Sequence, residues 1–281
     1  MRYQLGFKYS ITLHSFRKIE PLEYTLARLK EHGYDAAEMY GEPDQIDFKK
    51  IKETAVSCGL PICGITGMWG RASNDGLKRR LLSLEKDAIK HSENYVKKCI
   101  KMCQDIGGNE INICLFADSS LDFDANHGLV SEDQKKSALD NAIPLLSSLS
   151  QFASDHNVNL LIEPLNRYST PYCNTAKDAA YVAAEINQDN VGILLDTFHM
   201  NIEESSFEKA ILDSKSFVKH THFADNNRTM PGYAHLDFIP IVKTLQKIGY
   251  QGYVSFEPNL TADYESSTRT GLQFIKNLEN S

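Results

Sequence analysis

The sequence predicts a single (β/α)₈ barrel over residues 1–281, and three observations lead to this prediction. Strand-like and helix-like segments alternate without interruption, which is the pattern of repeated βα units. The alternation occurs eight times, as a closed barrel requires. No long linker or low-complexity tract divides the 281 residues, and their 42% hydrophobic content is enough to bury one large core. A doubly wound open sheet is the alternative, but it would gather the ends of the later strands around a common centre less readily.

Eight segments are expected to form strands, and eight longer ones are expected to form the helices that follow them. The strands are predicted at residues 4–9, 35–39, 61–66, 110–115, 158–163, 191–196, 218–223 and 252–257. The helices are predicted at residues 21–32, 48–58, 81–106, 132–156, 175–186, 206–212, 238–248 and 264–278. Glycines at 33, 59, 107 and 249 each follow a helix-like run, where a left-handed C-cap is needed, and a strand begins soon after each. Turn residues at 35, 110 and 159 mark strand starts.

Charge and composition exclude several classes of partner. A net charge of -7 provides no electrostatic footprint for a polyanion, so neither nucleic acid nor an anionic membrane is expected to bind. No apolar run approaches the length of a membrane span and the first residues do not resemble a signal peptide, so we expect a cytoplasmic protein. The six cysteines form no Cys-x-x-Cys pair and are expected to be buried thiols. A small-molecule protein is expected, and a homo-oligomer is compatible with the sequence.

Four predicted strands end in a residue that can ligate a metal ion: Glu163, Asp196, His222 and Glu257. Adjacent parallel strands lie about 4.8 Å apart, so these side chains would emerge at one end of the barrel and converge. Three carboxylates and one imidazole favour a hard or borderline divalent ion. Mn²⁺ is our first expectation, with Mg²⁺ and Co²⁺ as alternatives.

Four motifs in the second half of the chain resemble those of the sugar isomerase/epimerase family, the xylose isomerase-like group of barrels. They are Glu-Pro-Leu-Asn-Arg-Tyr from 163, Asp-Thr-Phe-His-Met-Asn from 196, His-Phe-Ala-Asp-Asn-Asn-Arg from 222, and Gly-Tyr-Val-Ser-Phe-Glu ending at 257. The motifs stand in the order and at the spacing of ketose 3-epimerases, and they are also similar to those of 3-dehydro-guloside 4-epimerases. The first half of the chain resembles the family only in outline.

The resemblance implies roles for particular residues. Glu163, Asp196, His222 and Glu257 would be the metal ligands, and Glu163 and Glu257 would also be the catalytic acid/base pair. His199 and Arg228 would hold substrate oxygens. The partner would be a small keto sugar or keto-glycoside.

One position departs from the ketose 3-epimerases, which carry a second glutamate where this chain has Ser169. The short neutral side chain favours a larger substrate of the 3-keto-glycoside type. Trp69, the only tryptophan, lies in the loop after the third predicted strand and is expected to be a wall of the substrate pocket or an anchor for that loop. Arg167, Asp225 and His235 are open to structural or functional roles, and the irregular stretch 116–130 is either a surface loop or a lid.

The chemistry of an epimerase agrees with these positions. Inverting a carbon next to a carbonyl requires two groups that exchange protons on opposite faces, and Glu163 and Glu257 lie on strands separated by two others. A divalent ion would bind the ketone oxygen and stabilise the enediolate. A lyase that cleaves a 3-keto-glycoside on the same ion is an alternative function, as is a non-catalytic binding barrel. An endonuclease IV-like phosphodiesterase is disfavoured, because the third and fourth predicted strands end without histidine.

Overall fold

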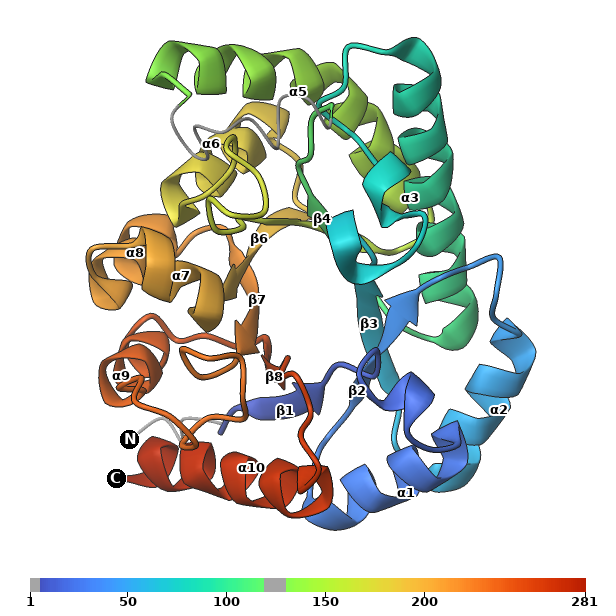
Figure 1. Cartoon of the computed structure of the whole chain (residues 1–281), viewed down its shortest axis with the longest axis vertical. Coiled ribbons are helices and arrows are strands. Elements are labelled where there is room, and N and C mark those ends of the chain that lie inside the picture. The colour runs from blue at the N-terminus through green and yellow to red at the C-terminus, as the bar shows by residue number, and fades with distance from the viewer. Residues whose placement is uncertain (1–5, 119–129) are drawn as a thin grey trace.

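Eight parallel strands form a ring in the computed structural model, which describes residues 6–118 and 130–281 (Figure 1). The strands are β1 (Lys8–Ile11), β2 (Ala37–Gly41), β3 (Ile62–Gly67), β4 (Glu110–Cys114), β5 (Asn159–Glu163), β6 (Val191–Asp196), β7 (Val218–Phe223) and β8 (Tyr253–Phe256). Each pairs with its neighbours in the order β1-β8-β7-β6-β5-β4-β3-β2. The predicted barrel is confirmed.

The seam between β1 and β2 is the weakest part of the ring. Thr12 and Glu38 form an isolated parallel bridge there, and the Leu13 amide donates to the Glu38 carbonyl at 2.9 Å. These contacts close the barrel just beyond the end of β1. The side chain of Glu38 is thereby directed into the interior, where it belongs to the site described below.

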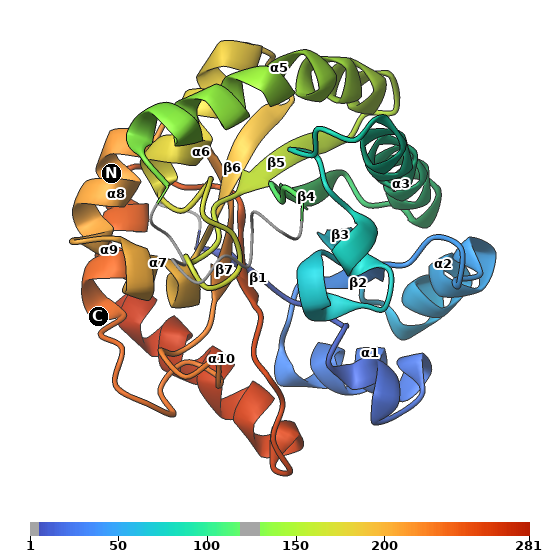
Figure 2. The same cartoon turned by 45° about the horizontal axis from the view of Figure 1, so that its top comes forward.

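Helices surround the ring on its outside (Figures 1 and 2). They are α1 (Leu22–His32), α2 (Phe48–Cys58), α3 (Lys86–Ile106), α5 (Glu132–Asp155), α6 (Ala176–Ile186), α7 (Thr197–Glu203), α8 (Phe207–Ser214), α9 (Ile239–Lys247) and α10 (Tyr264–Asn280). Gly33, Gly59 and Gly107 cap the first three in the left-handed conformation, as predicted. Capping boxes begin α5 and α6, since Ser131 and Thr175 each bond the third helical residue reciprocally.

The structure differs from the sequence-based expectation in three elements. The third helix begins at Lys86 rather than at residue 81, because residues 81–85 form turns between the barrel mouth and the helix. The short helix α7 was not predicted, since its seven residues follow β6 without a break and Asp196 serves as its N-cap. The first strand is shifted toward Ile11. The lid interpretation of 116–130 rests on residues 119–129, which lie outside the described residues.

The strands have few exposed positions, as parallel sheets covered by helices require. Every residue of β3, β4 and β6 is buried. Close packing at the end of β3 requires a glycine, because a Cβ on Gly67 would lie 2.2 Å from the Trp69 indole nitrogen. No described helix combines the length and apolar character that a membrane span demands.

Candidate active site

The four predicted ligand residues come together at the carboxyl end of the barrel. Glu163, Asp196 and His222 lie at or near the ends of β5, β6 and β7, and Glu257 directly follows β8. One ligand atom from each residue lies within 4.8 Å of the others. Asp196 and His222 have no exposed surface, and the two glutamates are also buried. Strand register produces this convergence, since Asp196 stands directly opposite His222.

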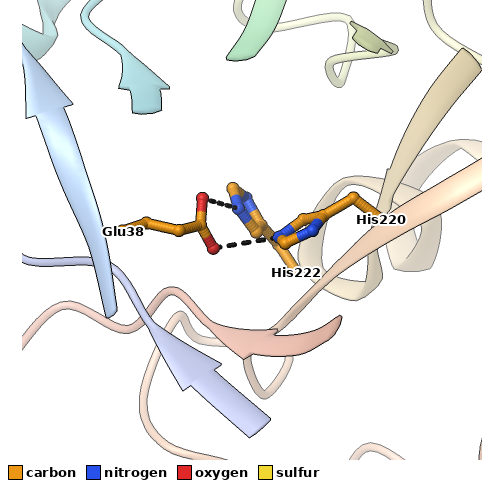
Figure 3. Close-up of side chains that lie close together, drawn as sticks. All are labelled: Glu38, His220 and His222. Carbon is orange, nitrogen blue, oxygen red and sulfur yellow. Dashed lines mark hydrogen bonds and ion pairs between the residues drawn. The ribbon is translucent and has the colours of Figure 1, made fainter. Parts of the chain in front are cut away.

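The His222 imidazole is oriented by a carboxylate beneath it. Its Nε2 lies 3.2 Å from Oε2 of Glu38, whose Oε1 lies 2.9 Å from Nε2 of His220, so one carboxylate from β2 bridges two histidines of β7 (Figure 3). The other ring nitrogen, Nδ1, lies 3.0 Å from Glu257 Oε2 and 3.9 Å from both Glu163 Oε1 and Asp196 Oδ2. Glu38 therefore directs Nδ1 toward the three acids, the arrangement commonly found around metal-bound histidines.

A divalent ion fits this group of residues. His222 Nδ1 is buried and lacks a hydrogen bond of acceptable geometry within residues 6–118 and 130–281. A buried polar atom of this kind is costly unless a partner is present, and a metal ion is the partner that three surrounding carboxylates would attract. Without an ion, burial lowers the pKa of His222 but Glu257 and Glu38 outweigh it and raise the pKa well above the usual value. An ion would replace the proton on Nδ1.

Arg228 approaches the site from the loop after β7. Its Nη1 donates to the two Asp196 carboxylate oxygens at 2.8 and 2.6 Å, and its Nη2 donates to Glu257. The backbone of Arg228 has φ +63°, which an L-residue adopts only at some cost in free energy. The buried Asp225 fixes this loop, because its carboxylate accepts four backbone N–H groups between residues 226 and 236. Asp225 is thus structural.

The two glutamates of the proposed acid/base pair differ in protonation. Burial, followed by the nearby charge of Glu257, raises the pKa of Glu163 to about 7. Burial also disfavours the charged form of Glu257, but Arg228 and His222 outweigh it and hold the pKa of Glu257 well below its usual range. These pKa shifts apply to the site without an ion, and a bound divalent ion would favour the ionised form of both carboxyl groups.

His199 belongs to α7 and is placed as a hydrogen-bond donor. Its Nδ1 accepts from the backbone N–H of Asn166 at 3.1 Å and lies 2.8 Å from the side-chain amide of the same residue. Burial lowers the pKa of His199 to about 4, so the ring is neutral and carries its proton on Nε2. Since His199 lines the cavity above the acids, this N–H is available to an oxygen atom there.

A cavity of about 530 Å³ opens above the three acids and the imidazole. Trp69, Phe198 and Tyr168 provide aromatic walls, and Ser169 lies at its edge. Trp69 lines this cavity, and its indole N–H donates to the Asn112 carbonyl at 3.4 Å, so contact with substrate remains a prediction. Aromatic walls beside a polar floor are typical of small-molecule sites.

The structure adds residues that the motif analysis missed. His14, just beyond β1, lines the cavity, and Asn112 of β4 donates to Glu163. Glu38 and His220 form the layer below. The sequence carried a signal for Glu38 and Asn112. Each is a polar side chain within an otherwise buried strand, and such a residue indicates an inward-facing functional position. Arg167 pairs with Glu203 at 2.8 Å on the surface and does not underlie the ligand layer.

The fold agrees with comparisons to known proteins. Residues 26–278 match the family described as the xylose isomerase-like TIM barrel. The chain belongs to this family. The resemblance inferred from the four motifs is thereby confirmed, and it extends to the first half of the barrel.

Xylose isomerase-like relatives of this chain include named sugar epimerases. A 3-dehydro-D-guloside 4-epimerase of Escherichia coli (strain K12) is 28% identical over 245 residues, covering 84% of this chain and 86% of the relative. A ketose 3-epimerase of Arthrobacter globiformis is 26% identical over 239 residues, covering 85% and 78%. The apo crystal structure of an E. coli 3-keto-D-glucoside 4-epimerase superimposes with a TM-score of 0.81 at 23% identity, covering 96% of this chain and 99% of that one.

Proposed function

We propose that this chain is a metal-dependent epimerase that inverts a carbon next to the ketone of a keto sugar. The observation that carries the proposal is the buried group of Glu163, Asp196, His222 and Glu257, in which two glutamates flank the other two ligands. Mn²⁺ is the ion that we expect. Relatives over more than four-fifths of the chain that are named epimerases support the reaction class.

The protein groups divide the reaction between them. Glu163 and Glu257 would act on opposite faces of the substrate carbon, one removing the proton next to the ketone and the other returning one. His199 donates a hydrogen bond from its Nε2–H to a substrate oxygen. Arg228 holds the Asp196 and Glu257 carboxylates in place. A bound divalent ion would supply Lewis-acid polarisation of the carbonyl.

We propose a 3-keto-glycoside as the substrate class, in preference to a small free ketose. Ser169 contributes a short neutral side chain to the cavity where the ketose 3-epimerases carry a carboxylate. The cavity of about 530 Å³ also continues toward the turns after β3, so a sugar held over the ligands has room for an attached unit. The similarity to the 3-dehydro-D-guloside 4-epimerase supports the same choice.

The substrate is tested by comparing kcat/KM for 3-keto-glycosides, tagatose, allulose and ketose phosphates under one metal condition. We expect at least about a tenfold preference for a 3-keto-glycoside, which corresponds to about 1.4 kcal/mol in transition-state binding. A tenfold preference for free tagatose or allulose would contradict the proposal. Release of the free aglycone in place of an epimer would show the lyase reaction on the same site.

His199→Ala is expected to lower kcat/KM by about 100-fold while metal affinity stays within a factor of about two, because one oxygen-stabilising donor is lost and no ligand is removed. Metal titration by calorimetry and steady-state kinetics measure the two effects separately. His235→Ala is the matched control, since His235 is exposed and does not line the cavity. Loss of metal from His199→Ala would instead identify His199 as a ligand.

A further inference from the structure

A second cavity of about 760 Å³ adjoins the one above the ligands. Arg71 and Ala72, in the turns that follow β3 (cyan in Figure 1), line both cavities and place them next to each other. A molecule bound over the ligand group can therefore extend past Arg71 into the second cavity. The chemistry of its lining then bears on the part of a substrate that does not react.

The lining of the second cavity is positively charged. Arg17 and Lys18 contribute two cations beside Arg71, which makes a further interaction of its own, although the chain as a whole has a net charge of -7. Among the described lining residues Glu42 is the only acid, and it is buried and neutralised by Arg79, whose Nη2 and Nη1 lie 2.9 and 3.3 Å from its two oxygens. The remaining lining residues are uncharged: Tyr40, Gln45, Ala72, Ser73, Asn74 and Leu77. The charges of these described residues are thus mainly positive, which favours an anionic ligand.

Two contacts hold the Arg17 side chain in position. The Arg17 guanidinium lies over the Tyr40 ring at 5.3 Å and donates to the Ala72 carbonyl at 3.4 Å, which ties the segment after β1 to the turn shared by the two cavities. Lys18 follows on the same short 3₁₀ turn and is exposed. An arginine that is fixed in this way presents its remaining N–H groups to an anion at a smaller cost in side-chain entropy.

We infer that the second cavity is a subsite for an anionic group on the unit attached to the keto sugar, such as the carboxylate of a uronate. This inference rests on the proposed function, and it narrows the substrate class to keto-glycosides with a negatively charged aglycone. Arginine and lysine bind carboxylates by charge-assisted hydrogen bonds, and an adjoining aromatic ring suits the apolar face of a sugar. A phosphate or sulfate in the same place would use the same contacts, so the experiment separates these sources.

The experiment measures binding to the Mn²⁺-loaded protein by calorimetry, with unreactive disaccharides that lack the ketone. Cellobiose is compared with the disaccharides that carry a carboxylate or a phosphate at C6 of one unit. We expect the carboxylate ligand to bind about tenfold more tightly than cellobiose at low salt, a preference of the size that a few exposed ion pairs provide. The preference should be smaller at high salt, because salt screens these ion pairs. Stronger preference for the phosphate ligand would assign the subsite to phosphate.

Two variants and a control locate the effect. Arg17→Gln and Lys18→Gln are each expected to lower the preference, and together to reduce it to about twofold or less. Lys78→Gln changes the charge by the same amount in the same region but does not line the cavity, since Lys78 pairs with Asp75 at 2.7 Å, and it is expected to keep the preference. Equal binding of neutral and charged ligands, no measurable binding of the charged ligands, or an equal loss in Lys78→Gln would overturn the inference.

The keto forms of the same disaccharides separate this inference from the proposed function. Epimerisation without a preference for the charged substrate would contradict the anionic subsite and support the proposed function. A binding preference without any epimerisation would support the subsite and contradict the function. A kcat/KM ratio that follows the binding ratio, and falls with it in the Arg17 and Lys18 variants, is the expected result.

Discussion

Asp196→Asn is expected to lower metal affinity by more than about 100-fold and to abolish turnover. Substitution of residues that only orient metal ligands typically lowers affinity by about 10- to 100-fold, and loss of a ligand itself should have a larger effect. Asp196 is fully buried, and its Oδ2 lies 3.9 Å from Nδ1 of His222. Asparagine has the same shape and keeps an oxygen to accept the Phe198 amide, which Asp196 bonds at 2.8 Å as the N-cap of α7. The substitution removes charge and leaves the cap in place.

The measurement is metal titration of the Asp196 variant, together with kcat/KM at saturating Mn²⁺ and the thermal unfolding midpoint. Asp237→Asn is a matched control, because Asp237 is exposed and also accepts a backbone N–H, from Ile239 at 2.9 Å, next to a helix start. The control is expected to change neither metal affinity nor turnover. Unchanged chelator sensitivity and turnover in Asp196→Asn would show that Asp196 is not a ligand.

Glu163→Gln and Glu257→Gln are expected to lower kcat by about 10²- to 10⁴-fold each, the contribution typical of one positioned acid or base. Glutamine retains an oxygen for the ion but can neither take nor return a proton. If the two glutamates act on opposite faces, each variant retains solvent exchange for the epimer whose proton faces the remaining glutamate. The other epimer loses its exchange.

Exchange is followed by mass spectrometry of each epimer incubated in D₂O with either variant at matched metal occupancy. Glu265→Gln, which changes an exposed glutamate on α10, is expected to behave like the unsubstituted protein. One variant could abolish deuterium exchange from both epimers while the other variant leaves exchange from both epimers unchanged. This result would show that one base serves both faces. That result would contradict the assignment of a pair.

The ligand group was predictable because its signal is local to each strand. An apolar run that ends in Glu163 or Asp196 predicts both the strand and its polar end, and parallel strands bring such ends together. Strand spacing then provides the convergence. No tertiary knowledge beyond the order of the strands was needed to predict that these side chains converge.

Other parts of the site depend on packing that no short segment records. Glu38 lies far from His222 in the chain, and its role became visible only when the ring placed β2 opposite β7 (Figure 3). Arg228 contacts Asp196 because its backbone adopts a positive φ, which sequence does not indicate for an arginine. The second cavity likewise combines the segment after β1, the end of β2 with the residues that follow it, and the turns after β3, three regions without a family motif.

Transfer of a solvent proton to carbon is the step on which the proposed function depends, and deuterium incorporation measures it directly. A 3-keto-glycoside is incubated in D₂O with the Mn²⁺-loaded protein, and the product is analysed by NMR after the ion is removed. We predict an inverted product with deuterium at the carbon next to the ketone, formed only when the divalent ion is present. An inverted product without deuterium at that carbon, or equal turnover in the metal-free protein, would contradict the account.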